Sequence, residues 1–418
     1  MRSSVMMIVV CGLLLIGCAG PGPNISPGIV TAVSQSAARR DQATFKLVYA
    51  FPNHKAGAYP YGSLFALNGS LYGTTLDGGS QCGSLGCGTV FSLSLKPSVK
   101  ETVLHSFANS PDGWTPYSGV TALGNTIYGT TVRPGYGVVY SVDLRSGREA
   151  VLHDFARTRD GRTPIGGMAV VGRTLYGTTS GGYHKRGSVF SIDSSGLESV
   201  VYRFKGNPDG AIPKGDLLAI GNVLYGTTES GGSDPGNHCA GNKGCGTVFS
   251  ITPGPSGAHE TVLYRFQGGE NDGAVPMGGL ISVNGLLYGV TASGGVPGCV
   301  DFDVTGCGTA FSLNPSTGQE VVLHKFQGGG DAEFPVGNLA HRNGTLYGVT
   351  YGTVFSLKLD GSGYTILHNF LGGRTDGSTP EAGLVLSNGI IYGTTGYGGG
   401  GKGCHSGGCG TIFSITPP

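Results

Sequence analysis

Charge is scarce in this chain of 418 residues: only 12 % are Asp, Glu, Lys or Arg, and the formal net charge is +1. Such a composition lacks the excess of basic residues that would attract nucleic acid or an anionic membrane surface, so we expect no nucleic-acid partner. No long apolar run follows the first 20 residues, which excludes a second membrane-spanning segment. The Gly-x-Ser-x-Gly and His-Glu-x-x-His motifs of hydrolases and metalloproteases are also missing.

Glycine, in contrast, is abundant, with 80 residues. Collagen would place glycine at every third position, and this chain does not. Disorder throughout is disfavoured because 39 % of the residues are hydrophobic and recur at regular spacing. No helical periodicity competes with the short β-branched and aromatic runs. The composition therefore predicts turn-rich, all-β structure.

The N-terminus predicts export. Arg2 precedes an apolar run from Val5 to Ile16, which is short for a bilayer span and typical of a signal peptide over residues 1–17. The run ends at Cys18 in a pattern that resembles the lipobox of bacterial lipoproteins, so we expect a lipid on Cys18; the alternative is an ordinary secretory signal. In that family an Ala after the cysteine, here Ala19, usually accompanies the outer membrane. Residues 18–44 are rich in Pro, Gly, Ser and Ala and are predicted to form a flexible tether.

A repeated unit fills the rest of the chain, residues 45–418. The segment "LYGTT" around Tyr72 occurs in seven similar copies. Each copy is followed by a "GTVFSL"-like segment, and each of the first six then by a "TVLHSF"-like segment. With the "GGL"-like segment before each copy, a complete unit contains four short strands, which we term A to D. Asn-Gly pairs such as Asn68-Gly69 predict tight A–B hairpins.

The chain ends predict a closed ring. Phe45 to Phe51, "FKLVYAF", is a D strand without A, B or C before it, and the last unit ends after its C strand. A ring explains this arrangement, because the first strand then completes the last blade. We therefore predict a seven-bladed β-propeller with four-stranded blades. Six or eight blades, or two linked smaller sheets, are the alternatives.

Eight cysteines form four pairs, and each pair lies in a B–C loop. Because an exported chain meets oxidising conditions, these pairs predict local disulfides. Zinc is the competing interpretation, but no loop offers a regular second pair of ligands, and the spacing is not that of redox motifs. The expected bonds are Cys82–Cys87, Cys239–Cys245, Cys299–Cys307 and Cys404–Cys409.

Antiparallel order places the B–C and D–A loops on one face, the predicted ligand face. Each D–A loop carries Asp four residues before Pro, except that Ala56 replaces the Asp in the first unit. The favoured interpretation is a turn in which Asp caps its own loop; the alternative is a ring of carboxylates that binds cations or sugars near the axis. The candidate ligand-face residues are Asp112, Trp114, Asp160, Asp209, Asp272, Asp331 and Asp376.

The ordered recurrence of YGTT, GTVFS and DGxxP resembles the GloVer tandem repeat of bacterial "choice-of-anchor" proteins, over residues 45–418, which are nearly all of the mature chain. The resemblance implies an exported protein attached to the cell surface, with no defined catalytic residues or cofactor. We expect a monomeric, lipid-anchored binding or scaffold module for a glycan or protein, without cofactor or metal. An exported lyase or glycoside hydrolase with an axial active site is the alternative, and a purely structural spacer is the third class.

Overall fold

The computed structural model describes residues 43–418 apart from 134, 157–159, 183–184, 194, 234–235, 237, 240–242, 255–256, 302–303 and 405–406. The expected signal peptide, Cys18 and the tether up to residue 42 lie outside the described residues. The chain divides into Met1–Asp41 and Gln42–Pro418, and the second unit contains every described residue.

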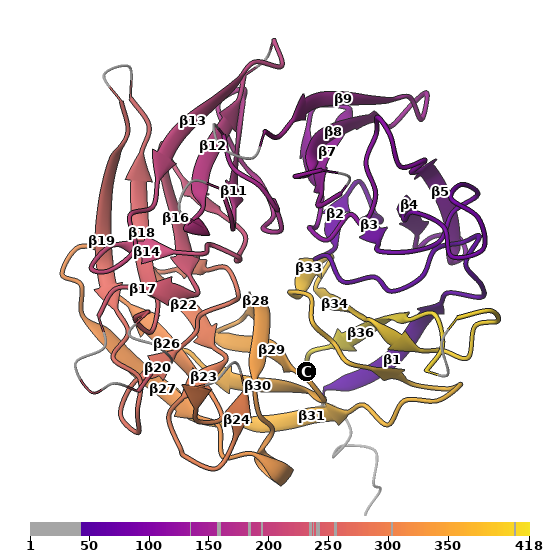
Figure 1. The fold of residues 1–418 in the computed structure, drawn as a ribbon. Helices are drawn as coiled ribbons and strands as arrows, with labels where there is room; N and C mark the ends of the chain where they lie inside the picture. The colour runs from indigo at the N-terminus through magenta and orange to yellow at the C-terminus, as the bar shows by residue number, and fades with distance from the viewer. Residues whose placement is uncertain are drawn as a thin grey trace, which may run out of the picture. The chain divides into compact units, whose positions relative to one another are not determined.

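Seven four-stranded antiparallel sheets make up this unit, and they surround a common axis (Figure 1). The prediction of a seven-bladed β-propeller is confirmed. Blade 1 comprises β2 (Phe65–Leu67), β3 (Ser70–Thr75), β4 (Thr89–Ser94) and β5 (Lys100–Ser106). Blade 2 comprises β6 (Thr121–Leu123), β7 (Thr126–Thr131), β8 (Val138–Asp143) and β9 (Glu149–Asp154). Blade 3 comprises β10 (Ala169–Val171), β11 (Thr174–Thr179), β12 (Ser188–Ile192) and β13 (Glu198–Arg203).

Blades 4 to 7 repeat the arrangement. Blade 4 comprises β15 (Leu218–Ile220), β16 (Val223–Thr228), β18 (Thr247–Thr252) and β19 (His259–Arg265). Blade 5 comprises β21 (Ile281–Val283), β22 (Leu286–Thr291), β26 (Thr309–Leu313) and β27 (Glu320–Lys325). Blade 6 comprises β28 (Pro335–Arg342), β29 (Thr345–Thr350), β30 (Thr353–Lys358) and β31 (Thr365–Asn369). Blade 7 comprises β33 (Val385–Ser387), β34 (Ile390–Thr395), β36 (Thr411–Thr416) and β1 (Thr44–Ala50).

Short elements occupy the loops between these strands. Four two-stranded pairings and one 3-10 helix are described, and three of the pairings join a D–A loop to the B–C loop that follows it. The three that join these loops are β14 (Gly210–Ala211) with β17 (Ser230–Gly231), β20 (Gly273–Ala274) with β23 (Ser293–Gly294), and β32 (Gly377–Ser378) with β35 (Tyr397–Gly398). The fourth pairing, β24 (Val300–Asp301) with β25 (Val304–Thr305), lies within one B–C loop, and the helix is η3 (Gly329–Asp331).

The Asn-Gly turns adopt the predicted geometry. Asn68 and Gly69 have φ angles of 50° and 79°, both in the left-handed region that a tight hairpin of this kind requires. The pairs at Asn284, Asn343 and Asn388 match them. Asn and Gly are the residues that enter this region at least cost, which explains why they recur at the A–B hairpins.

Ring closure is confirmed by the pairing of β1 with β36. Thr44 lies opposite Thr416 and Ala50 opposite Thr411, in antiparallel register. One irregularity falls between Leu47 and Tyr49. Because β1 covers the outer edge of the last sheet, blade 7 gains the fourth strand that every other blade has.

Aromatic rings join neighbouring blades. The Phe that follows each D strand packs edge to face against the aromatic residue of the next blade's C strand, as Phe51 does against Phe91 at 5.3 Å. Such pairs stabilise packing by roughly 0.5–1.5 kcal/mol beyond burial. The other pairs are Phe107–Tyr140, Phe155–Phe190, Phe204–Phe249, Phe266–Phe311, Phe326–Phe355 and Phe370–Phe413. Phe91 and its equivalents therefore fill space between adjacent blades.

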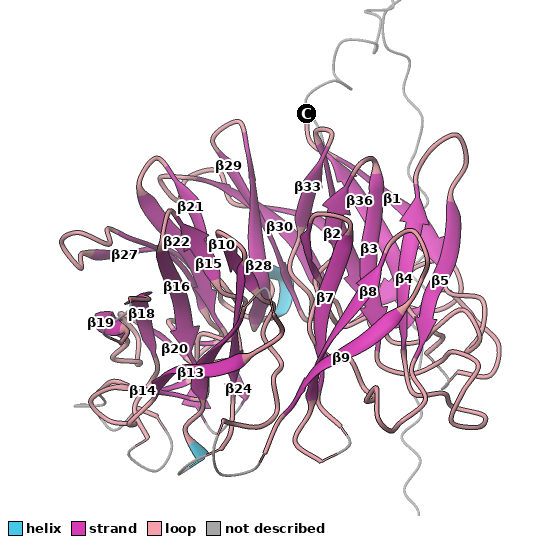
Figure 2. Ribbon diagram, turned by 90° about the horizontal axis from the view of Figure 1, so that it is seen from above, coloured by secondary structure: helices cyan, strands magenta, loops and turns pink. Residues whose placement is uncertain are grey.

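The glycine of YGTT leaves space for one of these rings. A Cβ placed on Gly73 would lie 2.7 Å from Cζ of Phe91. The longer loops gather at one end of the blades and the short hairpins at the other (Figure 2). The antiparallel order of the strands therefore produces the predicted loop-rich face.

Candidate functional site: an axial pocket on the loop-rich face

Each D–A loop crosses the loop-rich face from the outermost strand of one blade to the innermost strand of the next. The Asp of the repeated motif lies at the outer part of this path and the Pro at the inner part. Residues only four positions apart in sequence therefore face different surroundings.

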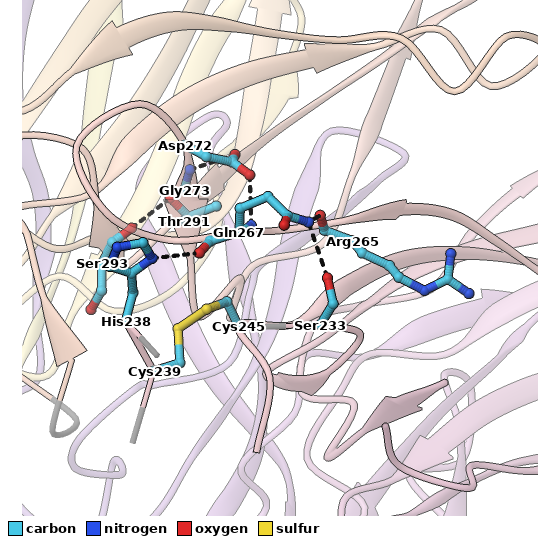
Figure 3. The surroundings of a disulfide bond; sticks show 10 residues. All are labelled: Ser233, His238, Cys239, Cys245, Arg265, Gln267, Asp272, Gly273, Thr291 and Ser293. Atoms are coloured by element: carbon cyan, nitrogen blue, oxygen red, sulfur yellow. Dashed lines mark hydrogen bonds between the residues drawn. A yellow bond between two sulfur atoms is a disulfide. The ribbon is translucent and has the colours of Figure 1, made fainter. Parts of the chain in front are cut away.

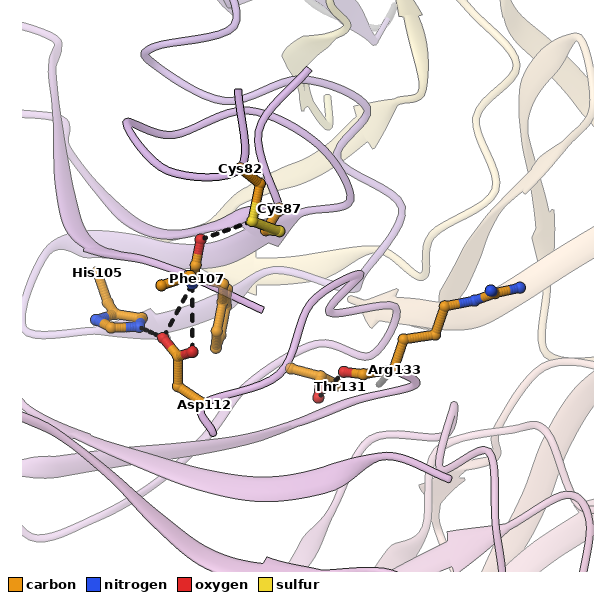
Figure 4. Close-up of polar contacts among 8 residues, drawn as sticks. Cys82, Cys87, His105, Phe107, Asp112, Thr131 and Arg133 are labelled. Atoms are coloured by element: carbon orange, nitrogen blue, oxygen red, sulfur yellow. Dashed lines mark hydrogen bonds and ion pairs between the residues drawn. A yellow bond between two sulfur atoms is a disulfide. The ribbon is translucent and has the colours of Figure 1, made fainter. Parts of the chain in front are cut away.

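The six aspartates lie beside the outer strands, where they accept hydrogen bonds from their own loops. In blade 1 the Asp112 carboxylate accepts the N–H of Ala108 at 3.1 Å and contacts Nε2 of His105 at 2.9 Å (Figure 4). Tyrosine replaces the histidine at two positions, and Tyr202 donates its hydroxyl to Asp209 at 3.0 Å. The equivalent backbone bonds reach Asp160, Asp209, Asp272, Asp331 and Asp376.

These bonds match the favoured interpretation, in which the Asp organises its own turn. Asp112, Asp160, Asp209 and Asp272 are buried, and the ligand-binding role stays an untested prediction. Trp114 is half-buried, and the Arg133 guanidinium lies over its ring at 5.4 Å. The structure thus places Trp114 against Arg133. Arg133 lines the axial pocket that is described next.

A pocket of about 440 Å³ lies at the axis of the ring. The residue directly after the motif Pro contributes to its wall in every one of the seven D–A loops. This position is chemically different in each repeat. Its occupants are Tyr61, Tyr117, Ile165, Lys214, Met277, Val336 and Glu381.

One side of the pocket is aromatic and acidic. Tyr61 and Tyr117 stack with ring centroids 5.8 Å apart, and Glu381 lies near both. Burial raises the pKa of Glu381 to about 7. Burial, followed by the negative charge of Glu381, raises the pKa of Tyr117 to about 12. Both groups are therefore neutral in slightly acidic solution and able to donate hydrogen bonds.

A polar network lines the inner wall. Asn338 donates from its side-chain amide to Asp216 at 2.6 Å, which joins blade 6 to blade 4. The other carboxylate oxygen of Asp216 accepts the N–H of Gly167, and the amide oxygen of Asn338 accepts the N–H of Gly279, each from a neighbouring blade. Because these partners fix both side chains, the pocket presents preorganised polar groups next to the aromatic rings.

Cationic groups complete the wall. Lys214 forms an ion pair with Glu229, and Arg133 stacks on Trp114. Tyr351 lines the pocket in blade 6, where the B–C connection shrinks to a turn between β29 and β30. The lining therefore contains both signs of charge, amide and aromatic groups.

Backbone strain accompanies the pocket. The residue before the motif Pro has φ between 53° and 61° in all seven loops, although several are β-branched. A left-handed β-branched residue costs roughly 1–3 kcal/mol, so the surrounding structure must hold it. The residues are Tyr59, Thr115, Thr163, Ile212, Val275, Phe334 and Thr379.

The disulfides help to keep four of these residues in the left-handed conformation. The four predicted bonds are confirmed, with Cα–Cα distances from 4.9 to 5.6 Å. In each pair the carbonyl of the second cysteine accepts the N–H of a strained residue, as Cys87 does from Thr115 at 3.0 Å. Cys245, Cys307 and Cys409 do the same for Val275, Phe334 and Tyr59. Each disulfide thus fixes the backbone two residues before a wall residue.

Figure 3 shows the surroundings of the Cys239–Cys245 bond. His238 contacts the carbonyl of Gln267 at 3.0 Å, and Gln267 donates its backbone N–H to Asp272 at 2.6 Å. The disulfide closes the B–C loop on itself, and hydrogen bonds join this loop to the next D–A loop.

The wall residues are not among the features that the repeats share, so the repeat pattern does not predict them. Their signal in the sequence is a position that varies among the repeats, directly after a Pro that all seven repeats contain. In a symmetric ring, variation at one axial position is how a single asymmetric site arises.

The fold and site define a seven-bladed β-propeller with a ligand-sized axial pocket. The chain belongs to the Gloeobacter/Verrucomicrobia repeat family, whose model matches residues 34–239 and 237–413. No match was found among curated proteins.

Solved structures of similar fold include the following two. The extracellular domain of a hybrid two component system of B. thetaiotaomicron has a TM-score of 0.55 and 13 % identity, covering 89 % of this chain and 39 % of that chain. An oligogalacturonate lyase in complex with manganese has a TM-score of 0.50 and 13 % identity, covering 90 % and 97 %. At these identities the likeness shows the fold alone.

Four disulfides are typical of an extracytoplasmic protein. Within the described part of the chain, no helix has the length and apolar character needed to cross a bilayer.

Proposed function

We propose that this propeller is a cell-envelope binding protein whose axial pocket binds a carbohydrate. The observation that carries the proposal is the stacked pair Tyr61 and Tyr117 beside the fixed polar groups of Asp216 and Asn338. Aromatic faces pack against the C–H faces of a sugar ring, while carboxylate and amide groups bond its hydroxyls. A partly apolar pocket with a few convergent polar groups is the general form of a small-ligand site.

The pocket volume supports an oligosaccharide end or a short segment rather than a long, fully enclosed chain. The carboxyl group of Glu381 adds a donor when protonated and an acceptor when ionised, so affinity should change between pH 6 and 8 around its pKa of about 7. A protein ligand inserting a side chain is the other outcome of the same test.

The test is a glycan array followed by calorimetry on the purified protein. Tyr117→Ala and Asp216→Asn should abolish binding to the glycan that the array selects. Leu371→Ala is a matched control, because Leu371 is 87 % exposed on the same D–A loop face and outside the pocket. Binding that survives Tyr117→Ala, or that is lost in Leu371→Ala, would place the ligand elsewhere.

A second candidate function is a polysaccharide lyase or glycoside hydrolase. It is favoured by Glu381, whose raised pKa of about 7 is the state that a general acid needs at neutral pH. Release of reducing or unsaturated ends from a panel of polysaccharides would show turnover, and Glu381→Gln should abolish it. Binding without turnover supports the pure binding protein.

Envelope attachment through a lipid on Cys18, in the outer membrane, is part of the proposal. It is supported by the lipobox-like sequence and by the four disulfides. Labelling of cells with a radioactive fatty acid should modify the wild-type protein and leave Cys18→Ser unlabelled. Equal labelling of both would exclude this attachment.

A further inference from the structure

A second set of polar side chains lies between the outer edges of neighbouring blades, away from the axial pocket. His105 lies near the end of β5, Asp112 in the loop that follows, and Glu149 at the start of β9 in the next blade. One nitrogen or oxygen from each of the three lies within 4.8 Å of the others. We call this set cluster 1.

The next junction repeats the arrangement as cluster 2. His153, Asp160 and Glu198 also place one atom each within 4.8 Å of one another. β9 therefore contributes Glu149 at its start to cluster 1 and His153 near its end to cluster 2.

Hydrogen bonds and packing fix the histidine and the aspartate. In cluster 2 the N–H of Ala156 donates to Oδ1 of Asp160 at 2.8 Å, while Oδ2 faces Nε2 of His153 at 2.7 Å. The imidazole packs edge to face against Phe155 with centroids 4.8 Å apart. In cluster 1, His105 packs on Phe107 at the same distance. Rotamers held in this way are typical of preorganised ligands.

Each of the two glutamates has one carboxylate oxygen without a hydrogen-bond partner among the described residues. Oε1 of Glu149 and Oε1 of Glu198 are both buried and unpaired. Each cluster therefore holds two carboxylates close together, one of them incompletely satisfied, beside a single imidazole. A buried anionic group without a partner is costly, and a cation would satisfy it.

We propose that clusters 1 and 2 are sites for a divalent transition-metal ion such as Zn²⁺, one ion in each. The ligands are Nε2 of the histidine and one oxygen from each carboxylate. Imidazole nitrogen with carboxylate oxygen is a donor set that suits Zn²⁺, with metal–ligand distances of about 2.0–2.2 Å. The histidine side chains are 18 % and 20 % exposed, which leaves access for the ion and for a water at the fourth position.

The other junctions of the ring show what happens when one ligand is replaced. Tyr202 and Tyr264 stand where the histidine would be, and each donates its hydroxyl to the local Asp at 3.0 Å. These two junctions retain both carboxylates, Asp209 with Glu260 and Asp272 with Glu320.

At two further junctions an aromatic residue stands in place of the glutamate. Tyr364 stacks on His324 at 3.8 Å, and Phe45 stacks on His368 at 3.5 Å. At the junction of blades 7 and 1, Ala56 replaces the Asp. Among the described residues, the complete His-Asp-Glu set therefore occurs only in clusters 1 and 2.

This variation provides a matched substitution. Changing His105 and His153 together to Tyr reproduces the arrangement that the chain already adopts at Tyr202 and Tyr264, so the ring should fold. The test is calorimetric titration of the EDTA-treated full chain with ZnCl₂, together with thermal unfolding with and without the metal. The wild-type protein should bind two ions, one per cluster, and unfold at higher temperature when they are present.

His105→Tyr/His153→Tyr should lose both ions and keep the metal-free unfolding temperature of the wild type. Glu149→Gln/Glu198→Gln should weaken Zn²⁺ binding by more than roughly tenfold. This second variant tests the proposal even if His105→Tyr/His153→Tyr fails to fold. His368→Tyr, at a junction without the glutamate, should still bind two. Absence of saturable Zn²⁺ binding by the wild type, or retention of both ions by His105→Tyr/His153→Tyr, would overturn the proposal.

Discussion

Replacing Asp272 by Ala should destabilise the propeller. The Asp272 carboxylate is 6 % exposed and accepts hydrogen bonds from the hydroxyl of Tyr264 at 3.0 Å and from the N–H groups of Gln267 and Gly273, each at 2.6 Å. Each donor left without an acceptor in a buried place costs about 1–3 kcal/mol. Burial raises the pKa of Asp272, so removal of the carboxylate also relieves a desolvation cost.

Balancing these effects, we expect a net loss of about 3 kcal/mol, because water can reach part of the vacated space. For a folded unit of this length, that loss lowers the unfolding temperature by about 4 °C. Differential scanning calorimetry of the oxidised protein measures it directly.

Asp331→Ala is the matched control. Asp331 occupies the same motif position but is 25 % exposed at its side chain, and it accepts one backbone N–H, from Gln327 at 3.0 Å. We expect a loss of about 1 kcal/mol. If Asp272→Ala unfolds at the wild-type temperature yet loses ligand binding, the turn-organising role of the motif Asp is wrong and the carboxylate ring is the binding site.

Three further predictions concern the ring as a whole. Deleting β1 (Thr44–Ala50) exposes the edge of β36, so the truncated protein should aggregate or unfold, as size-exclusion chromatography would show; a stable monomer would contradict closure. Replacing Cys299 and Cys307 by Ser opens a loop of eight residues in sequence separation and should lower the free energy of unfolding by about 2 kcal/mol, measured by calorimetry. Burial raises the pKa of Glu101 to about 7 and of Glu320 to about 8. Protonation of either carboxyl group therefore favours the folded state. Stability is therefore largest below about pH 4.5 for these groups and falls as pH rises towards 8, by about 1 kcal/mol each after solvent screening; Glu101→Gln/Glu320→Gln should flatten this slope, and an unchanged slope would contradict the assignment.

Much of the ring was accessible from the sequence because its determinants are local and repeated. The hairpin at Asn68-Gly69 follows from the two residues that tolerate its φ angles, and closure follows from the unpaired strand at Phe45. The disulfides follow from cysteine pairs five to eight residues apart in the B–C loops of a chain that its N-terminus predicts to be exported.

The sites depend on geometry that no single repeat contains. Tyr61 and Tyr117 belong to different units and meet only because the ring brings their loops to one axis. Glu149 begins a strand and His105 nearly ends another, so their proximity depends on how neighbouring blades twist past each other. A bulge in every C–D pair, for example opposite Val90 and Phe91, adds to that twist just before the histidine or tyrosine.

The most direct test of the axial site is a crystal structure of the protein with the glycan that the array selects. We predict a sugar ring against Tyr61 and Tyr117, with hydroxyls bonded to Asp216 or Asn338. A glycan bound at the outer edge of the loop-rich face, beside the motif aspartates and away from the axis, would contradict the account.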